Sequence, residues 1–244
     1  PGRGMLGCDF TVVIEVTVED TLELPIEKLR QLDFNVVSMK VQSAISKLEA
    51  EIPADEGIRT ALRLGDSCLI VGEVRSLEAK ALYEAMRVGA LSNLVAGTIH
   101  GDTPYGIFDR VVHDLGVAPT SFKATDLIVM PKPVMSPDGL SRLRRLINIT
   151  EVRKDWVEDP GRENGFADLL KYNAAKDVIE PTEVLLNGES WLLNNIASSI
   201  RGWKGEWEKV WSDIKLRSQM VKSTVDYKKK YNIPQISASS GFLV

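Results

Sequence analysis

The chain has 244 residues, of which 44% are hydrophobic, and this size and composition suit one large folded domain or two small ones. The 34 acidic residues outnumber the 30 basic ones and give a net charge of −4, which does not favour nucleic acid or an anionic membrane surface as the main partner. Cys8 and Cys68 are the only cysteines, which excludes a disulfide framework and a CxxC zinc site and indicates a reducing, cytoplasmic compartment.

Strand-like and helix-like segments alternate through the first half of the chain. Four short runs rich in β-branched and aliphatic residues predict strands at 10–18, 67–72, 93–99 and 126–130. Segments between them carry helix formers and end signals, which predicts helices at 56–64, 76–89 and 103–115. Ser76 and Thr103 are the expected N-caps, and Gly89 and Gly116 follow the last turns. Residues 22–55 fit neither pattern consistently.

Strands that alternate with helices are typical of a parallel sheet with helices on both faces. The apolar run CLIV at 68–71 agrees with this interpretation, because the strands of such sheets are buried on both sides. We therefore expect an α/β core over residues 1–133.

The pattern changes after residue 133. LRRLINITEV at 143–152 predicts one further strand. Two short helices are predicted, for FADLLKY at 166–172 and for WLLNNIASSI at 191–200. Apolar residues spaced by three, four and seven predict an amphipathic helix at 206–227. Residues 134–244 are therefore predicted to form a strand and a mostly helical region, with a poorly ordered tail after Tyr231. No apolar run reaches the roughly 20 residues of a membrane span, so none is expected.

Polar residues follow three of the predicted strands. Glu19 and Asp20 follow the first, Glu73 follows the second, and His100 follows the third. The carboxyl ends of parallel strands meet at one edge of a sheet, where open α/β folds bind their ligands. We therefore expect these side chains to lie close together.

Two carboxylates and a histidine at such an edge suit nucleotide hydrolysis. A magnesium ion takes carboxylate help, often through water, and the attacking water needs a carboxylate to orient it. Zinc is a poorer fit, because His100 and His113 are the only histidines. Taken singly, Glu73 could also be a solvated loop carboxylate, His100 a structural histidine, and Glu19–Asp20 part of a turn.

Three segments resemble motifs of the type II/type IV secretion ATPases. IRTALRLGDSCLIVGEVRSLEAKALYEAM resembles the Walker B region of that family, VTVEDTLELP its Asp box, and AGTIHGDTPYGIFDRVVHDLGV its His box. The resemblance covers about residues 11–131 and is looser from 132 to 244, where ENGFADLL and the Trp-rich end carry it. The archaeal branch is the most similar, because the four-cysteine insert of the bacterial branch is absent.

The resemblance implies a RecA-like P-loop NTPase core at 1–133 that assembles as a homo-hexamer and uses ATP and Mg²⁺. Glu73 would position the attacking water, His100 would sense the γ-phosphate, and Glu19 would act with Asp20 near the magnesium. Gly72, Arg75 and Arg110 would contribute to nucleotide binding. The implied function is ATP hydrolysis that powers protein secretion or the assembly of type IV pili or archaellum-like filaments. The protein would work in the cytoplasm, bound at the membrane periphery through an inner-membrane platform protein.

One motif of the family is absent from this sequence. The Walker A loop, G-x-x-x-x-G-K-[ST], should precede the Asp box and hold the phosphates, but PGRGMLGCDF contains no such loop. We therefore expect the chain to be a fragment that begins after this loop, and expect it to bind ATP weakly and to be inactive alone.

Two other functions stay open. A non-catalytic adaptor or regulatory relative could keep the fold without a P-loop. A RecA-like nucleic-acid motor is disfavoured by the acidic balance and by the lack of a basic stripe interleaved with aromatic residues.

Overall fold

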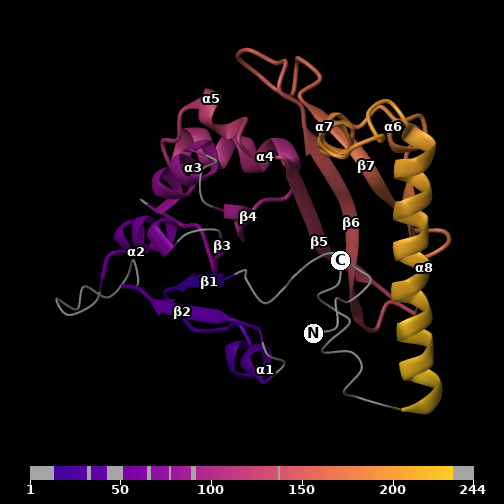
Figure 1. The fold of residues 1–244 in the computed structure, drawn as a ribbon, viewed down its shortest axis with the longest axis horizontal. Helices are drawn as coiled ribbons and strands as arrows, with labels where there is room; N and C mark the ends of the chain where they lie inside the picture. The colour runs from indigo at the N-terminus through magenta and orange to yellow at the C-terminus, as the bar shows by residue number, and fades with distance from the viewer. Residues whose placement is uncertain are drawn as a thin grey trace. The chain divides into compact units, whose positions relative to one another are not determined.

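The computed structural model describes residues 14–31, 34–42, 52–64, 67–76, 78–88, 92–136 and 138–232 (Figure 1). The chain divides into two compact units, Pro1–Thr125 and Asp126–Val244. Both units combine helices with a four-stranded sheet, so the α/β class is confirmed. Within the described part of the chain, no helix is both long and apolar enough to cross a membrane.

The sheet of the first unit is parallel throughout. Its strands are β1 (Ile14–Glu19), β2 (Val36–Lys40), β3 (Ser67–Val71) and β4 (Ser92–Gly97). They lie in the order β2-β1-β3-β4, with β1 between β2 and β3. The strands predicted at 67–72 and 93–99 are confirmed. The first one is confirmed from Ile14 onward, and residues 10–13 lie outside the described residues. β2 falls in the segment to which the sequence assigned no element.

Helices connect these strands and follow the last of them. They are α1 (Ile26–Arg30), α2 (Ala54–Ala61), the 3₁₀ turn η1 (Leu62–Leu64), α3 (Glu78–Val88), α4 (Pro104–Asp109), the π-helical segment η2 (Arg110–Asp114) and α5 (Pro119–Phe122). The predicted start of α4 is confirmed, because the side chain of Thr103 accepts a hydrogen bond from the N–H of Gly106 and Pro104 occupies the first turn. Gly116 ends this helix with a φ of +66°.

Helices cover both faces of the parallel sheet. Gly57 of α2 packs against Val18 of β1, and Leu82 of α3 packs against Gly97 of β4. Val36 of β2 lies beside Glu15 of β1, and Glu15 and Val18 point to opposite faces of the sheet. Val36 packs against Ile26 and Leu29, so α1 covers the face opposite to α2 and α3. The sheet is thus held between α2 and α3 on one side and α1 on the other.

The second unit contains an antiparallel sheet. Its strands are β5 (Leu127–Met135), β6 (Arg142–Val152), β7 (Phe166–Asn173) and β8 (Val178–Pro181), which pair in chain order. Three helices follow: α6 (Glu183–Leu186), α7 (Trp191–Ser199) and the long α8 (Trp207–Tyr231). The predicted strand at 143–152 and the helices at 191–200 and 206–227 are confirmed.

Three expectations for this region need correction. The strand predicted at 126–130 is present at the start of β5, but it pairs antiparallel with β6 in the second unit and does not belong to the parallel core in which it was expected. The helix predicted for FADLLKY is wrong, because these residues form β7, which pairs with β6 and β8. Ala167 and Leu169 alternate with less buried neighbours, which is the period of a strand, and tertiary pairing outweighed the helix propensity of Ala and Leu. A mostly helical C-terminal region is likewise not confirmed, since the unit is built on four strands. The tail after Asn232 lies outside the described residues.

Candidate functional site

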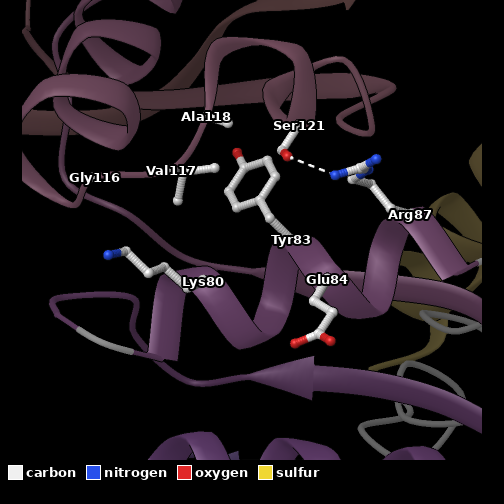
Figure 2. Close-up of a pocket in the computed structure, with 8 residues that line it drawn as sticks. All are labelled: Lys80, Tyr83, Glu84, Arg87, Gly116, Val117, Ala118 and Ser121. Carbon is white, nitrogen blue, oxygen red and sulfur yellow. Dashed lines mark hydrogen bonds between the residues drawn. The ribbon is translucent and has the colours of Figure 1, made fainter.

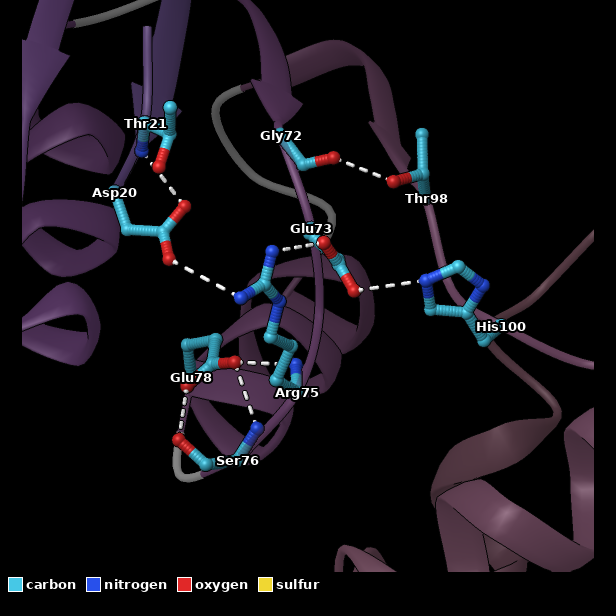
Figure 3. A network of polar contacts seen from close by, with 9 residues as sticks. All are labelled: Asp20, Thr21, Gly72, Glu73, Arg75, Ser76, Glu78, Thr98 and His100. Atoms are coloured by element: carbon cyan, nitrogen blue, oxygen red, sulfur yellow. Dashed lines mark hydrogen bonds and ion pairs between the residues drawn. The ribbon is translucent and has the colours of Figure 1, made fainter. Parts of the chain in front are cut away.

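The polar residues singled out in the sequence meet at one edge of the parallel sheet. Asp20 directly follows β1, Glu73 lies just beyond β3, and His100 lies just beyond β4. Figure 3 shows Asp20 and Glu73 on either side of the Arg75 guanidinium, with His100 facing Glu73. The expectation that these residues lie together is therefore confirmed by the geometry.

Glu73 is the centre of this polar network. Its Oε2 accepts a hydrogen bond from Nη2 of Arg75, and its Oε1 lies 3.2 Å from Nε2 of His100. Nη1 of Arg75 lies 3.7 Å from Oδ2 of Asp20, so one guanidinium joins carboxylates from two strand ends. The Glu73 side chain is 23% exposed and that of His100 is 79% exposed, so the network opens to solvent on the histidine side.

The surrounding positive charges keep Glu73 ionised. The hydrogen bond from Arg75 lowers the pKa of Glu73 below its ordinary value, and although partial burial opposes this, the charges of Arg75, His100 and Arg110 lower it further. The same hydrogen bond raises the pKa of Arg75. Arg110, the first residue of η2, therefore influences the site through its charge, which lowers the pKa of Glu73.

Glu78 holds the turn that carries Arg75. Its Oε1 accepts the backbone N–H of Arg75 and of Ser76, and its Oε2 accepts the hydroxyl of Ser76 at 2.7 Å. Burial raises the pKa of Glu78, but these hydrogen bonds outweigh burial and leave the pKa below its ordinary value. A carboxylate at the first residue of α3 also suits the positive end of the helix dipole.

Glu19 lies below the network. It is 2% exposed, and its Oε2 accepts the backbone N–H of Glu23 at 2.9 Å and of Leu24 at 3.0 Å. Its Oε1 is buried and accepts no hydrogen bond from any residue that the structure describes. Gly72 gives Glu19 room, because a Cβ at Gly72 would lie 2.9 Å from Cγ of Glu19. Glu19 thus anchors the loop after Asp20, and its assignment to catalysis stays a prediction.

The comparison with known protein families agrees with this geometry. The family described as "Type II/IV secretion system protein" matches residues 10–136, which is just over half of the chain and includes every residue of the network. The chain belongs to this family.

Two proteins of known sequence are similar to this secretion-system protein. MJ1287, an uncharacterized protein of Methanocaldococcus jannaschii, is 30% identical over 188 residues, which are 76% of this chain and 63% of that protein. Type II secretion system protein E of Aeromonas hydrophila is 29% identical over 115 residues, which are 47% of this chain and 20% of that protein. The chain therefore spans less than two thirds of either relative.

Two solved structures are also similar to this chain. The ATPase DotB of Legionella pneumophila has a TM-score of 0.42 and 18% identity, with 56% of this chain and 36% of DotB covered. The VirB11 ATPase of the Brucella suis type IV secretion system, solved in complex with sulphate, has a TM-score of 0.42 and 17% identity, with 58% of this chain and 40% of VirB11 covered.

The carboxylates of the site suit magnesium that is bound partly through water. No group of three His, Cys, Asp or Glu side chains in the described segments could hold a metal ion by itself. Magnesium in nucleotide sites, however, needs only one or two carboxylates, since waters and phosphates supply the other ligands. The carboxylate of Asp20 belongs to the open network and fits such a partial donor set, whereas Glu19 is 2% exposed and held under the loop after Asp20, so its role as a second magnesium donor stays a prediction.

Two residues that no sequence motif singled out also shape the site. Glu78 pins the backbone of Arg75, and the hydroxyl of Thr98 donates a hydrogen bond to the backbone oxygen of Gly72. The available signal for Glu78 was a serine and a glutamate at the start of a predicted helix, which is typical of side-chain capping. No sequence pattern indicated the contact of Thr98, because 26 residues separate it from Gly72.

Proposed function

We propose that the complete protein is an ATPase with a RecA-like core that powers protein secretion or the assembly of a type IV pilus-like or archaellum-like filament. The observation that carries this proposal is the convergence of Asp20, Glu73 and His100 on the edge of a parallel sheet in a secretion-system family member. Acidic and cationic groups at this edge suit a bound nucleotide and the water that attacks it.

Each residue has a proposed role in this reaction. Glu73, which its neighbours keep ionised, orients the water and accepts its proton. His100 is the most exposed member of the network and contacts the γ-phosphate as a donor. Arg75 and Arg110 bind phosphate oxygens, and Gly72 leaves room for close packing at the strand end. Asp20, together with Glu19, would hold the magnesium ion, which would neutralise phosphate charge.

The resting network also defines an order of events. Both oxygens of Glu73 are engaged, one by Arg75 and the other by His100. Glu73 orients a water only after at least one of these contacts opens. Phosphate oxygens attract the same two cations, so nucleotide binding and the release of Glu73 are coupled in this proposal.

The proposal extends to the assembly of the protein. The active form is a homo-hexamer in the cytoplasm, with ATP bound between subunits or lobes, and it acts at the membrane through an inner-membrane platform protein. The similarity to a type II secretion system protein E supports this setting. The printed sequence has no G-x-x-x-x-G-K-[ST], so we propose that the 244-residue chain alone does not turn over ATP.

The decisive experiment is Glu73→Gln in the complete reading frame. We expect ATP turnover to fall by at least about 100-fold, because the water loses its acceptor, while binding of a fluorescent ATP analogue changes by less than about threefold. Glu208→Gln is the matched control, since Glu208 is an exposed glutamate on α8. A Glu73→Gln protein that hydrolyses ATP at the normal rate contradicts the proposed function.

A non-catalytic adaptor is the second candidate. It is favoured by the engagement of both Glu73 oxygens, which an adaptor could keep as a permanent structural contact. A complete reading frame that lacks a Walker A loop and shows no ATP binding would support the adaptor and reject the ATPase.

A further inference from the structure

Glu78, the first residue of α3, is a buried carboxylate that lies next to the polar network. It is 7% exposed, and both its oxygens face the turn before α3. Oε1 accepts the backbone N–H groups of Arg75 and Ser76, and Oε2 accepts the hydroxyl of Ser76 (Figure 3). Burying a carboxylate is unfavourable unless its oxygens are satisfied, and here the turn that carries Arg75 satisfies both of them.

The turn between β3 and α3 is held at both ends. On the strand side, the N–H of Val74 bonds to the carbonyl oxygen of Thr98 at 2.8 Å, and Val74 is 3% exposed. On the helix side, Glu78 accepts the N–H groups of the next two residues. The backbone of Arg75 is therefore fixed before and after this residue, and only the rotamers of its side chain stay free.

The helix that carries Glu78 is itself anchored to the first unit. Tyr83 of α3 is 6% exposed, and its hydroxyl bonds to Oγ1 of Thr125 at 3.0 Å. Figure 2 shows Arg87 of α3 reaching Ser121, to whose Oγ its Nη1 donates at 3.2 Å. Glu78 thus reaches the turn from a support that is already in place, which a residue that positions another one needs.

The position of Arg75 determines which carboxylates its guanidinium reaches. Nη2 donates to Oε2 of Glu73 and Nη1 lies 3.7 Å from Oδ2 of Asp20, although the Arg75 side chain is 40% exposed. An ion pair on an exposed arginine is weak when the whole side chain must be ordered to form it, because the lost freedom offsets the attraction. A fixed backbone removes part of that loss, so Glu78 strengthens these contacts through the backbone of Arg75.

Only a carboxylate at this position accepts all three hydrogen bonds. Glutamine has the same size, but it offers one acceptor oxygen and an NH₂ group, which cannot accept from the donors of the turn. Burial raises the pKa of Glu78, but the hydrogen bonds from Arg75 and Ser76 outweigh burial and leave the pKa below its ordinary value, so the carboxylate is ionised at neutral pH. Glu78→Gln therefore weakens the contacts that hold the turn and keeps the size of the side chain.

We propose that Glu78 is a positioning residue for the reaction at Glu73. It acts through Arg75, which it holds where the guanidinium contacts Asp20 and Glu73 at rest and a phosphate oxygen when a nucleotide is bound. The backbone of Arg75 need not move for its side chain to exchange a carboxylate for a phosphate. The placement of Arg75 at rest follows from the contacts of the described residues, whereas the contact with phosphate rests on the proposed function.

Carbon-13 NMR titration of Glu73 in the 244-residue chain tests the placement. Glu78→Gln should raise the pKa of Glu73 by at least about a third of the rise that Arg75→Ala causes, because the guanidinium is held less firmly. Loss of the Glu78 charge by itself would lower the pKa of Glu73, so a rise indicates that Arg75 has moved. In the Arg75→Ala background, Glu78→Gln should give no rise. Glu56→Gln is the matched control, since Glu56 is an exposed glutamate in the first turn of α2, and it should leave the pKa of Glu73 unchanged.

Two results would overturn the placement. One is an unchanged or lowered pKa of Glu73 in folded Glu78→Gln, and the other is a rise of equal size in the Arg75→Ala background. Circular dichroism checks that Glu78→Gln folds. Ser76→Ala removes only one of the three donors and should raise the pKa of Glu73 by a smaller amount. If Glu78→Gln does not fold, an unchanged pKa in Ser76→Ala overturns the placement instead.

Binding of a fluorescent ATP analogue to the complete protein tests the phosphate contact. We expect Glu78→Gln to weaken binding at least about threefold, and to weaken it no further in the Arg75→Ala background. Normal binding by Glu78→Gln together with weakened binding by Arg75→Ala would overturn the positioning role alone. Normal binding by both variants would reject the proposed phosphate contact of Arg75, while the titration of Glu73 would still decide the placement.

Discussion

Replacing Gly72 by alanine tests the packing beneath the proposed catalytic edge. The new Cβ would lie 2.9 Å from Cγ of Glu19 and 3.4 Å from its Cβ, and Gly72 does not have a positive φ, so the clash is the main effect. Either β3 shifts or Glu19 leaves its place under the loop after Asp20. Overpacking of this kind costs about 1–3 kcal/mol, and we expect Gly72→Ala to destabilise the first unit by that amount.

A double-mutant cycle isolates the cause. Glu19→Ala removes the Cγ that the new methyl group meets, so Gly72→Ala in that background should be neutral or should stabilise by up to about 1 kcal/mol, because alanine restricts the unfolded chain. The coupling energy between Gly72 and Glu19 is then about 1–4 kcal/mol. Glu19→Ala by itself should also destabilise, since the N–H groups of Glu23 and Leu24 lose their acceptor.

The assay is urea unfolding followed by far-UV circular dichroism, with hydrogen exchange of the β1 and β3 amides as the local measurement. All five tryptophans lie in the second unit, so tryptophan fluorescence monitors that unit separately and serves as the internal control. Additive losses for the two substitutions, with no coupling energy, would refute the contact between Gly72 and Glu19 as the source of the effect.

Two further predictions test the ionised groups. Arg75→Ala should raise the pKa of Glu73 toward its ordinary value, and carbon-13 NMR of the carboxyl group measures this pKa. Because Arg75 lowers the pKa of Glu73 in the folded state, the pair stabilises the protein above the unfolded-state pKa, and this stabilisation is lost as the pH falls through the folded-state pKa. An unchanged titration of Glu73 in the variant would contradict this. Glu151→Ala should destabilise the second unit by about 3–5 kcal/mol, since this fully buried carboxylate accepts hydrogen bonds from Ser190 Oγ and from the N–H groups of Trp191 and Leu192. Urea unfolding followed by tryptophan fluorescence measures that loss, which should stay below about 0.5 kcal/mol for the exposed control Glu208→Ala.

The candidate site illustrates which contacts sequence reasoning reaches. Because parallel strands end at one edge, the order of strands and helices was enough to predict that Asp20, Glu73 and His100 meet. The same reasoning could not separate Glu19 from Asp20. Side chains of adjacent strand residues point to opposite faces, and only packing determined that Glu19 is buried under a loop while Asp20 contacts Arg75.

The sequence by itself determined the alternation of strands and helices in the first unit and the carboxyl ends of β1, β3 and β4, because hydrophobic periodicity, capping residues and glycines act locally. Only the tertiary structure decided that FADLLKY is a strand, since pairing with β6 and β8 supplies hydrogen bonds that local propensity cannot reveal. Tertiary structure alone also brings Lys80 and Arg87 of α3 to face Gly116 and Ser121. Contacts between residues far apart in the chain depend on how whole elements pack, and packing is not encoded in any short stretch of sequence.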